Sequence, residues 1–115
     1  MGRPREELLA QIRWISRYIA SEDSRGCAFL NAAAEFPDPS HMVRAMVARN
    51  KQTLRRRVLS LCMAAGAADA ALLADQLVLM IDGAFAGSEA LGKNGPARTL
   101  ARAAQAAINA ALPDK

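Results

Sequence analysis

At 115 residues, the chain is long enough for one compact domain with a hydrophobic core. Apolar residues make up 52% of it, with alanine the commonest, and aromatic residues only 4%, which excludes a strand-rich fold and predicts an all-α protein. The net charge of +4 is too small to indicate a nucleic-acid partner by itself.

The first helix is expected over residues 4–21, because Pro4 fits a first helical turn and an apolar residue then recurs at helical spacing. The residues of this buried stripe are Leu8, Ile12, Ile15 and Ile19. Trp14 and Tyr18 form an adjacent stripe of large, partly polar side chains. The charged residues at 3–7 are unlike a signal peptide.

A turn follows at residues 21–26, and a short helix is expected over residues 27–35. Phe36-Pro37-Asp38-Pro39-Ser40 ends that helix, because proline disfavours the helical conformation in the residue before it. The third helix is expected from residue 40 or 41 to residue 65, with Gly66 as its C-terminal cap.

The fourth helix, capped by Asp69, is expected to end near Leu91 and is apolar almost all round, which predicts burial on more than one side. Asp75, Gln76 and Asp82 lie within it, and each would need a partner inside a bilayer. We therefore expect a soluble, cytoplasmic protein without a membrane span.

The fifth helix is expected from Pro96 to near Leu112 and is rich in alanine, so two helix backbones can approach each other closely there. The fourth and fifth helices carry more apolar surface than a monomer of this size can bury. We therefore predict a homodimer in which these two helices from each subunit form a four-helix bundle. Its interface is predicted at Ala84, Ser88, Leu100, Ala104, Ala107, Ile108 and Ala111.

Three segments in a fixed order carry a family resemblance. They are residues 25–41 (RGCAFLNAAAEFPDPSH), residues 51–61 followed by AAGA at 64–67, and ADQL at 74–77 followed by IDGA at 81–84. In order and spacing they resemble the C-terminal domain of TetR-family transcriptional regulators, and they cover nearly the whole chain. The first segment is the most specific of the three.

The resemblance implies a five-helix domain that binds a small molecule among its helices and dimerises through its last two. Ligand binding would change the separation of two N-terminal helix-turn-helix heads, each of which needs roughly 45 to 50 residues before the first helix. Such a head is absent from this sequence, so this chain alone is expected to bind no DNA. An excised domain and a natural truncation both remain open.

Two positions depart from the family pattern. Met42 stands where similar sequences usually carry proline, and Asn50 stands where they often carry histidine. Either residue could contact the ligand, so the ligand of a relative cannot be transferred to this chain.

The effector is expected to be small and largely apolar, in a cavity with a few polar groups that fix its orientation. The candidate ligand-binding residues are Trp14, Tyr18, Phe29, Met46, Asn50, Leu77, Met80 and Ile81. Methionines suit such a cavity because they adapt to ligands of different shape. The alternative is that these side chains simply fill the core, which is the better interpretation for each aliphatic member.

Other polar residues favour structural roles. A carboxylate at Asp82 inside an apolar run needs a partner, and pairing with an arginine or a backbone donor is preferred over a functional role. Asn31 and Glu35 share a helix face and most simply bond to the neighbouring loop. Arg55, Arg56 and Arg57 point in different directions around a helix, so they form a solvated face rather than a nucleic-acid stripe.

The sequence carries no enzyme signature. Cys27 and Cys62 lack metal-ligand spacing, and nothing near His41, the only histidine, completes a metal site or a catalytic triad. We therefore expect two free thiols, no catalytic residue, no metal and no cofactor. Two alternatives to a plain sensor domain remain open: a headless partner that forms mixed dimers with an intact regulator, and a cavity protein that serves as a catalyst host.

Overall fold

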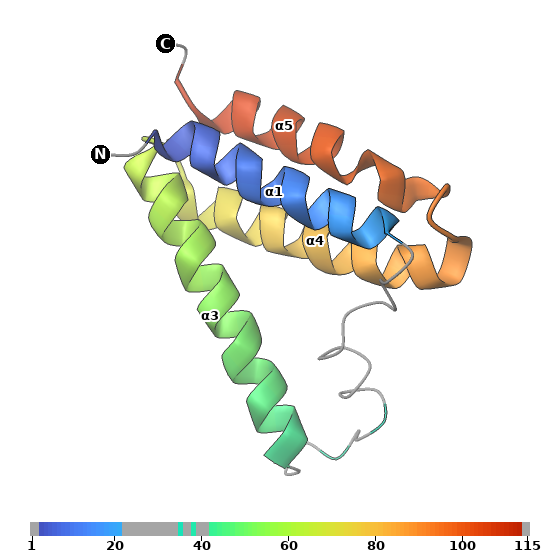
Figure 1. Cartoon of the computed structure of the whole chain (residues 1–115). Coiled ribbons are helices and arrows are strands. Elements are labelled where there is room, and N and C mark those ends of the chain that lie inside the picture. The colour runs from blue at the N-terminus through green and yellow to red at the C-terminus, as the bar shows by residue number, and fades with distance from the viewer. Residues whose placement is uncertain (1–2, 22–34, 36–37, 39–41, 114–115) are drawn as a thin grey trace.

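The computed structural model describes residues 3–21, 35, 38 and 42–113 (Figure 1). These residues form helix α1 (Pro4–Ala20), α3 (Met42–Ala64), α4 (Ala70–Leu91), the 3-10 helix η1 (Pro96–Thr99) and α5 (Leu100–Ala111). The described ranges contain no strand, so the predicted all-α class is confirmed. The short helix expected at residues 27–35 lies, apart from Glu35, outside the described residues, so the count of five helices stays a prediction.

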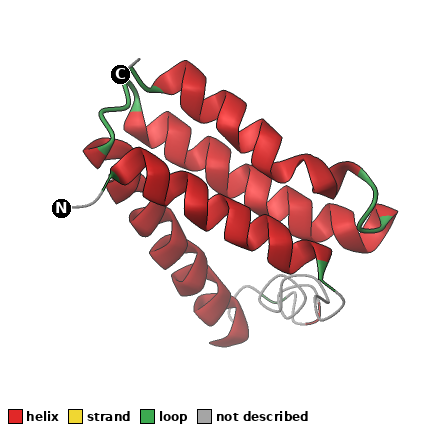
Figure 2. Cartoon of the chain, turned by 45° about the horizontal axis from the view of Figure 1, so that its top comes forward, coloured by secondary structure: helices red, strands yellow, loops and turns green. Residues whose placement is uncertain are grey.

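Helices α1, α4 and α5 run side by side, whereas α3 diverges from them (Figures 1 and 2). α1 packs against both α4 and α5, and α3 contacts α1 and α4. The end of α3 that connects to α4 lies close to the other helices, and its opposite end extends away from them (Figure 1). Among the described helices, α3 therefore packs on its neighbours mainly through its middle and its C-terminal half.

The ends of the helices follow the chemistry of their residues. After α3, Gly66 has a φ of +84°, and the amides of Gly66 and Ala67 donate to the carbonyls of Met63 and Cys62. This is the hydrogen-bond pattern of a Schellman motif, which favours glycine because of its left-handed backbone. At the start of α4, the Asp69 carboxylate accepts from the amide of Leu72, as predicted for a cap.

One boundary differs from the sequence prediction. The segment from Pro96 begins as a 3-10 helix and becomes α-helical only at Leu100. The tight turn before it explains the difference, because the Gly95 amide bonds to the Gly92 carbonyl and the Arg98 amide bonds to the Gly95 carbonyl. A Cβ at position 95 would lie 2.8 Å from the Leu91 carbonyl oxygen, so the turn requires glycine.

The core lies where α1, α4 and α5 meet, and α3 adds only two buried residues to it, Val58 and Cys62. The largest fully buried side chains are Leu8, Ile12, Cys62, Leu73, Leu77, Ile81 and Ile108. Both buried residues of α3 belong to its C-terminal half, and residues 42–50 contain none. The hydrophobic effect therefore fixes one half of α3 and leaves the other half without a buried anchor.

Candidate functional site

Two ion pairs join α3 to α4. Lys51 Nζ lies 2.7 Å from Asp82 Oδ1, and Arg55 Nε lies 2.6 Å from Asp75 Oδ1. Because the higher-numbered residue of α3 pairs with the lower-numbered residue of α4, the helices run in opposite directions at this contact. The structural pairing expected for Asp82 is present, with a lysine rather than an arginine as its partner.

The two pairs differ in their exposure to solvent. The side chains of Lys51 and Asp82 are only 20% and 28% exposed, which makes this pair part of the packing between the helices. The Arg55–Asp75 pair lies at the surface. A hydrogen bond from Arg55 lowers the pKa of Asp75, and the same bond raises the pKa of Arg55.

Three aromatic side chains from two helices meet beside this junction. The rings of Trp14 and Tyr18 are nearly parallel, with centroids 5.8 Å apart and an interplanar angle of 4°. The Tyr18 ring also meets Phe85 of α4, at 6.3 Å and 58°. We call Trp14, Tyr18 and Phe85 the aromatic cluster. Phe85 lies three residues after Asp82 on the same helix, so the cluster and the Lys51–Asp82 pair occupy neighbouring positions.

The structure separates the residues predicted to bind a ligand into groups. Trp14 and Tyr18 are exposed and belong to the aromatic cluster. Met46 and Asn50 are exposed on the N-terminal half of α3. Leu77 and Ile81 are buried in the core, so the alternative interpretation as core residues describes their position. Met80 borders α5 instead, and Phe29 lies outside the described residues.

The sequence interpretation missed Phe85, and it assigned no partner to Lys51. The sequence could have indicated Phe85, because the chain has only five aromatic residues and Phe85 lies one helical turn after Ile81, which was predicted to bind the ligand. No sequence pattern could reveal that Lys51 meets Asp82, because the contact depends on the angle between α3 and α4.

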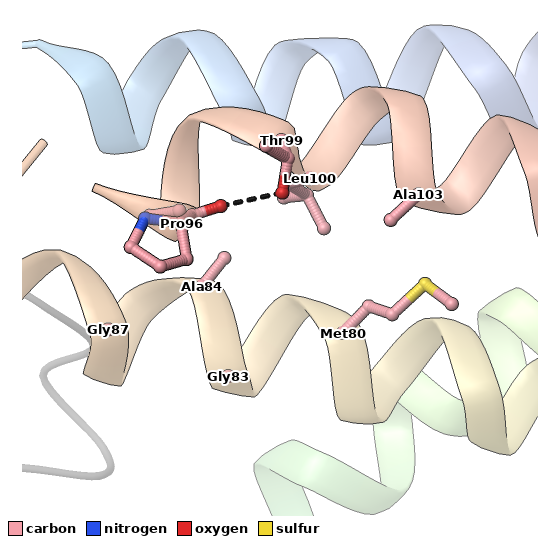
Figure 3. A pocket seen from close by; sticks show the side chains of 9 residues that line it. Met80, Gly83, Ala84, Gly87, Pro96, Thr99, Leu100 and Ala103 are labelled. Carbon is pink, nitrogen blue, oxygen red and sulfur yellow. Dashed lines mark hydrogen bonds between the residues drawn. The ribbon is translucent and has the colours of Figure 1, made fainter. Parts of the chain in front are cut away.

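A second region of interest lies along the seam between α4 and α5. Near η1, a hollow of about 200 Å³ is bounded by both helices (Figure 3). It is lined by Met80, Gly83, Ala84, Gly87, Pro96, Ala97, Thr99, Leu100 and Ala103. Towards the other end of the seam lies a hollow of about 270 Å³, lined by Ala68, Asp69, Leu72, Leu73, Gln76, Ala107, Ala110 and Ala111.

The outward side of this seam is apolar and uncharged between its ends. Leu79 is 74% exposed there and Leu72 is 54% exposed. We call this surface the α4–α5 face, and it consists of Leu72, Gln76, Leu79, Gly83, Ala86 and Ala90 on α4, Thr99 at the end of η1, and Ala103, Ala107 and Ala110 on α5. Their spacing of three or four residues places them on one side of each helix. None of them is charged, in a chain with 23% charged residues.

The residues predicted for the dimer interface lie next to this face, and most of them point inward. Ala104 and Ile108 have no exposed surface, and Leu100, Ala84 and Ser88 are also buried within the single chain. Ala107 and Ala111 are partly buried and line the seam. The sequence pattern selected the side of each helix with the larger apolar residues, and that side packs into the protomer's own core.

Helix α4 is long and apolar enough to cross a membrane by length and composition, with 28% of its apolar window buried. Its two carboxylates, Asp75 and Asp82, are however paired with α3, and its other sides pack on α1 and α5. The core helix of a water-soluble domain passes the same test, so this finding is weak evidence for a membrane span.

Few side chains in the described part of the chain could act in catalysis or bind a metal ion. Cys62 is fully buried, and this burial raises the pKa of its thiol, which disfavours the reactive thiolate. His41 and Cys27 fall outside the described ranges. Over residues 3–21 and 42–113, no three histidine, cysteine or acidic side chains come together in a way that could hold a metal ion.

Comparison with known proteins identifies the architecture. The family described as "Tetracyclin repressor-like, C-terminal domain" matches residues 4–107. A TetR-family transcriptional regulator from Streptomyces coelicolor has a similar crystal structure, with a TM-score of 0.88 and 30% sequence identity over 96% of this chain. The chain spans 55% of the length of that regulator. A search of curated proteins found no match. The chain therefore belongs to the TetR family of transcriptional regulators and corresponds to the C-terminal domain.

Proposed function

We propose that the chain is the effector-sensing and dimerisation domain of a TetR-type repressor that acts in the cytoplasm. The observation that carries this proposal is the uncharged α4–α5 face, which fits a second copy of the chain. In this proposal, residues 1–115 form one domain that binds the effector and dimerises.

The composition of the α4–α5 face supports self-association. An exposed apolar patch without charged residues is unusual on a monomeric protein and is typical of the centre of a protein interface. Two copies related by a twofold axis would bury Leu72 and Leu79 and would complete a four-helix bundle. The residues in contact would then be those of the face, and the buried Ala104 and Ile108 would support them from behind.

Two glycines of α4 strengthen this argument. A Cβ added to Gly83 or Gly87 would meet nothing within 4 Å, so packing inside the protomer does not require glycine at either position. Each glycine inside a helix nevertheless costs about 0.5–1 kcal/mol relative to alanine. A close approach by the partner's backbone supplies a reason for keeping both residues.

The sensing part of the proposal concerns the other side of α4. Residues 42–50 of α3 lack a buried anchor, and the aromatic cluster and the Lys51–Asp82 pair lie at the place where α3 leaves α4. A small, largely apolar effector bound beside Trp14, Tyr18 and Met46 would bury surface that α3 leaves exposed. Because Trp14 and Tyr18 belong to α1, such binding would bias the position of that helix, to which a DNA-reading head would be joined.

Sedimentation equilibrium at falling protein concentration tests the proposal. We expect a mass twice that of the 12.3 kDa chain, and a loss of this dimer in Leu79→Arg, because an unpaired charge would be buried in the interface. Met63→Arg is the matched control, since Met63 is 64% exposed but lies on α3 away from the face. A wild-type chain that stays at the monomer mass at all concentrations would contradict the proposal.

A further inference from the structure

We infer that the effector is an uncharged, planar aromatic molecule with a ring hydroxyl, which stacks on the aromatic cluster and donates a hydrogen bond to Asp82. This inference rests on the proposed sensing function and adds the chemical class of the ligand. Three features of the molecule support it: the distribution of its aromatic residues, the geometry of their rings and the charge beside them.

The distribution of aromatic residues is the first observation. The chain has one tryptophan, one tyrosine and three phenylalanines, and alanine dominates its apolar content. Every aromatic residue in the described part of the chain belongs to the aromatic cluster. The other two aromatic residues of the sequence, Phe29 and Phe36, are not among the described residues. Tyr18 and Phe85 come from different helices, so the convergence is a property of the fold.

The geometry of the rings is the second observation. Trp14 and Tyr18 are stacked with parallel planes at a centroid distance typical of offset stacking. Trp14 is nevertheless 61% exposed, so the stack ends on an indole that is largely open to solvent. A planar ring of the ligand can extend this stack. A saturated ligand of equal area would gain only hydrophobic burial, which a leucine or methionine at this position would provide equally well.

The charge beside the cluster is the third observation. Lys51 and Asp82 form a partly buried pair whose opposite charges offset each other, so a charged ligand group beside them would compete with the pair. Lys51 donates to Oδ1 of Asp82, and no donor to Oδ2 is recorded from any described residue. A carboxylate oxygen in this position accepts a hydrogen bond from a ring hydroxyl.

Two probes of the same carbon skeleton test the inference with the full chain. 1-Naphthol is planar and carries a hydroxyl, and decahydro-1-naphthol keeps the hydroxyl but is saturated. We expect titration calorimetry to give about three- to tenfold tighter binding of 1-naphthol, which is the contribution of aromatic stacking beyond buried area. Ring currents of 1-naphthol should also shift the Nε1–H signal of Trp14, the only indole in the chain, in a ¹⁵N-resolved NMR spectrum.

Variants locate the binding. Trp14→Leu should remove the preference for 1-naphthol and leave the affinity for decahydro-1-naphthol nearly unchanged. Met63→Leu, an exposed position on α3, is the matched control and should alter neither affinity. Trp14 is exposed, so its replacement does not remove core packing, and circular dichroism checks that the variant is folded.

The outcomes separate the inference from the proposed function. Equal affinity for both probes, or binding of 1-naphthol without a shift of the Trp14 signal, would overturn the aromatic class while effector sensing in general stands. Failure of 1-naphthol to bind a protein that sediments as a dimer would also overturn the inference alone. A monomeric chain would count against the proposed function itself.

Discussion

The chain presents two exposed apolar surfaces on opposite sides of α4, and they differ in kind. The α4–α5 face is mostly aliphatic and uncharged, with a shallow hollow towards each end, and it includes Gly83, whose missing side chain leaves space above the backbone. The aromatic cluster is small, and a partly buried ion pair lies beside it. An uncharged surface with small residues suits another helix, whereas stacked rings with a polar neighbour suit a small molecule.

The difference follows from how each side is supported. Behind the α4–α5 face, both helices are anchored by fully buried residues such as Leu77 and Ile108. On the other side, residues 42–50 of α3 have no buried anchor. A surface backed by a well-packed core is suited to stable association, and a helix segment without buried residues is suited to responding to a ligand. Helix α4 belongs to both sides and can couple them.

The largest effect is expected from Ile108→Ala, which tests whether the core and the α4–α5 face are distinct. Ile108 is fully buried in the protomer, so the truncation should lower the free energy of unfolding by about 2–5 kcal/mol. Urea titration in a monomeric Leu79→Arg background measures this loss without a contribution from dissociation. If unfolding of the monomer were unchanged and the wild-type dimer alone were weakened, Ile108 would be an interface residue, as the sequence pattern predicted.

Gly83→Ala should have a smaller effect, which stabilises the monomer and weakens the dimer. The monomer should become more stable by about 0.5–1 kcal/mol, because alanine favours a helix and its Cβ meets nothing in the protomer. The proposed dimer should dissociate about tenfold more readily, because the added methyl group would separate the two backbones. Gly87→Ala should behave in the same way. If the Gly83→Ala dimer were as tight as wild type, the partner's backbone would not approach α4 at Gly83.

The helices were largely predictable from the sequence, because their limits depend on local chemistry. The prolines at positions 4 and 96, the cap at Asp69 and the glycine at position 66 mark ends that the structure reproduces within two residues. The exception is the first turn after Pro96, where the preceding Gly92–Gly95 turn favours a 3-10 helix. Local patterns therefore carry most of the secondary structure.

The functional surfaces were less predictable, because an apolar residue has the same pattern whether it packs inward or faces a partner. Helix α4 is apolar on both sides, and the sequence cannot tell Ala84, which is buried, from Leu79, which is exposed. In the same way Leu77 and Trp14 were grouped together, although they lie in the core and on the surface. Only the crossing angles of the helices decide which stripe becomes core.

Replacing Lys51 tests the polar element that distinguishes the aromatic side from the α4–α5 face. Lys51→Met keeps the aliphatic stem and removes the ammonium group from the partly buried Asp82, so we expect a loss of about 1 kcal/mol in the free energy of unfolding. A double-mutant cycle with Asp82→Leu isolates the energy of the pair. Additive effects of the two changes would show that the pair does not hold α3 against α4.

The smallest effect is expected at the exposed Arg55–Asp75 pair, and it depends on pH. The hydrogen bond from Arg55 lowers the pKa of Asp75 in the folded chain below its ordinary value of 3.8. The folded state therefore binds a proton less readily than the unfolded state, and the stabilisation is complete above the unfolded pKa and is lost as the pH falls through the folded pKa. Asp75→Asn should thus be slightly less stable than wild type at neutral pH.

Urea titrations of both proteins down to strongly acidic pH would measure this difference. It should stay constant to about pH 5 and then shrink, because protonation leaves wild type with an uncharged side chain at position 75, as in the variant. Arg55 keeps its charge throughout this range, so Asp75 alone titrates in the pair. A difference that persists at the lowest pH would mean that Asp75 stabilises α4 through something other than its charge. The Arg55–Asp75 contact would then be independent of acid, and among the described residues the Lys51–Asp82 pair would be the contact between α3 and α4 that depends on charge.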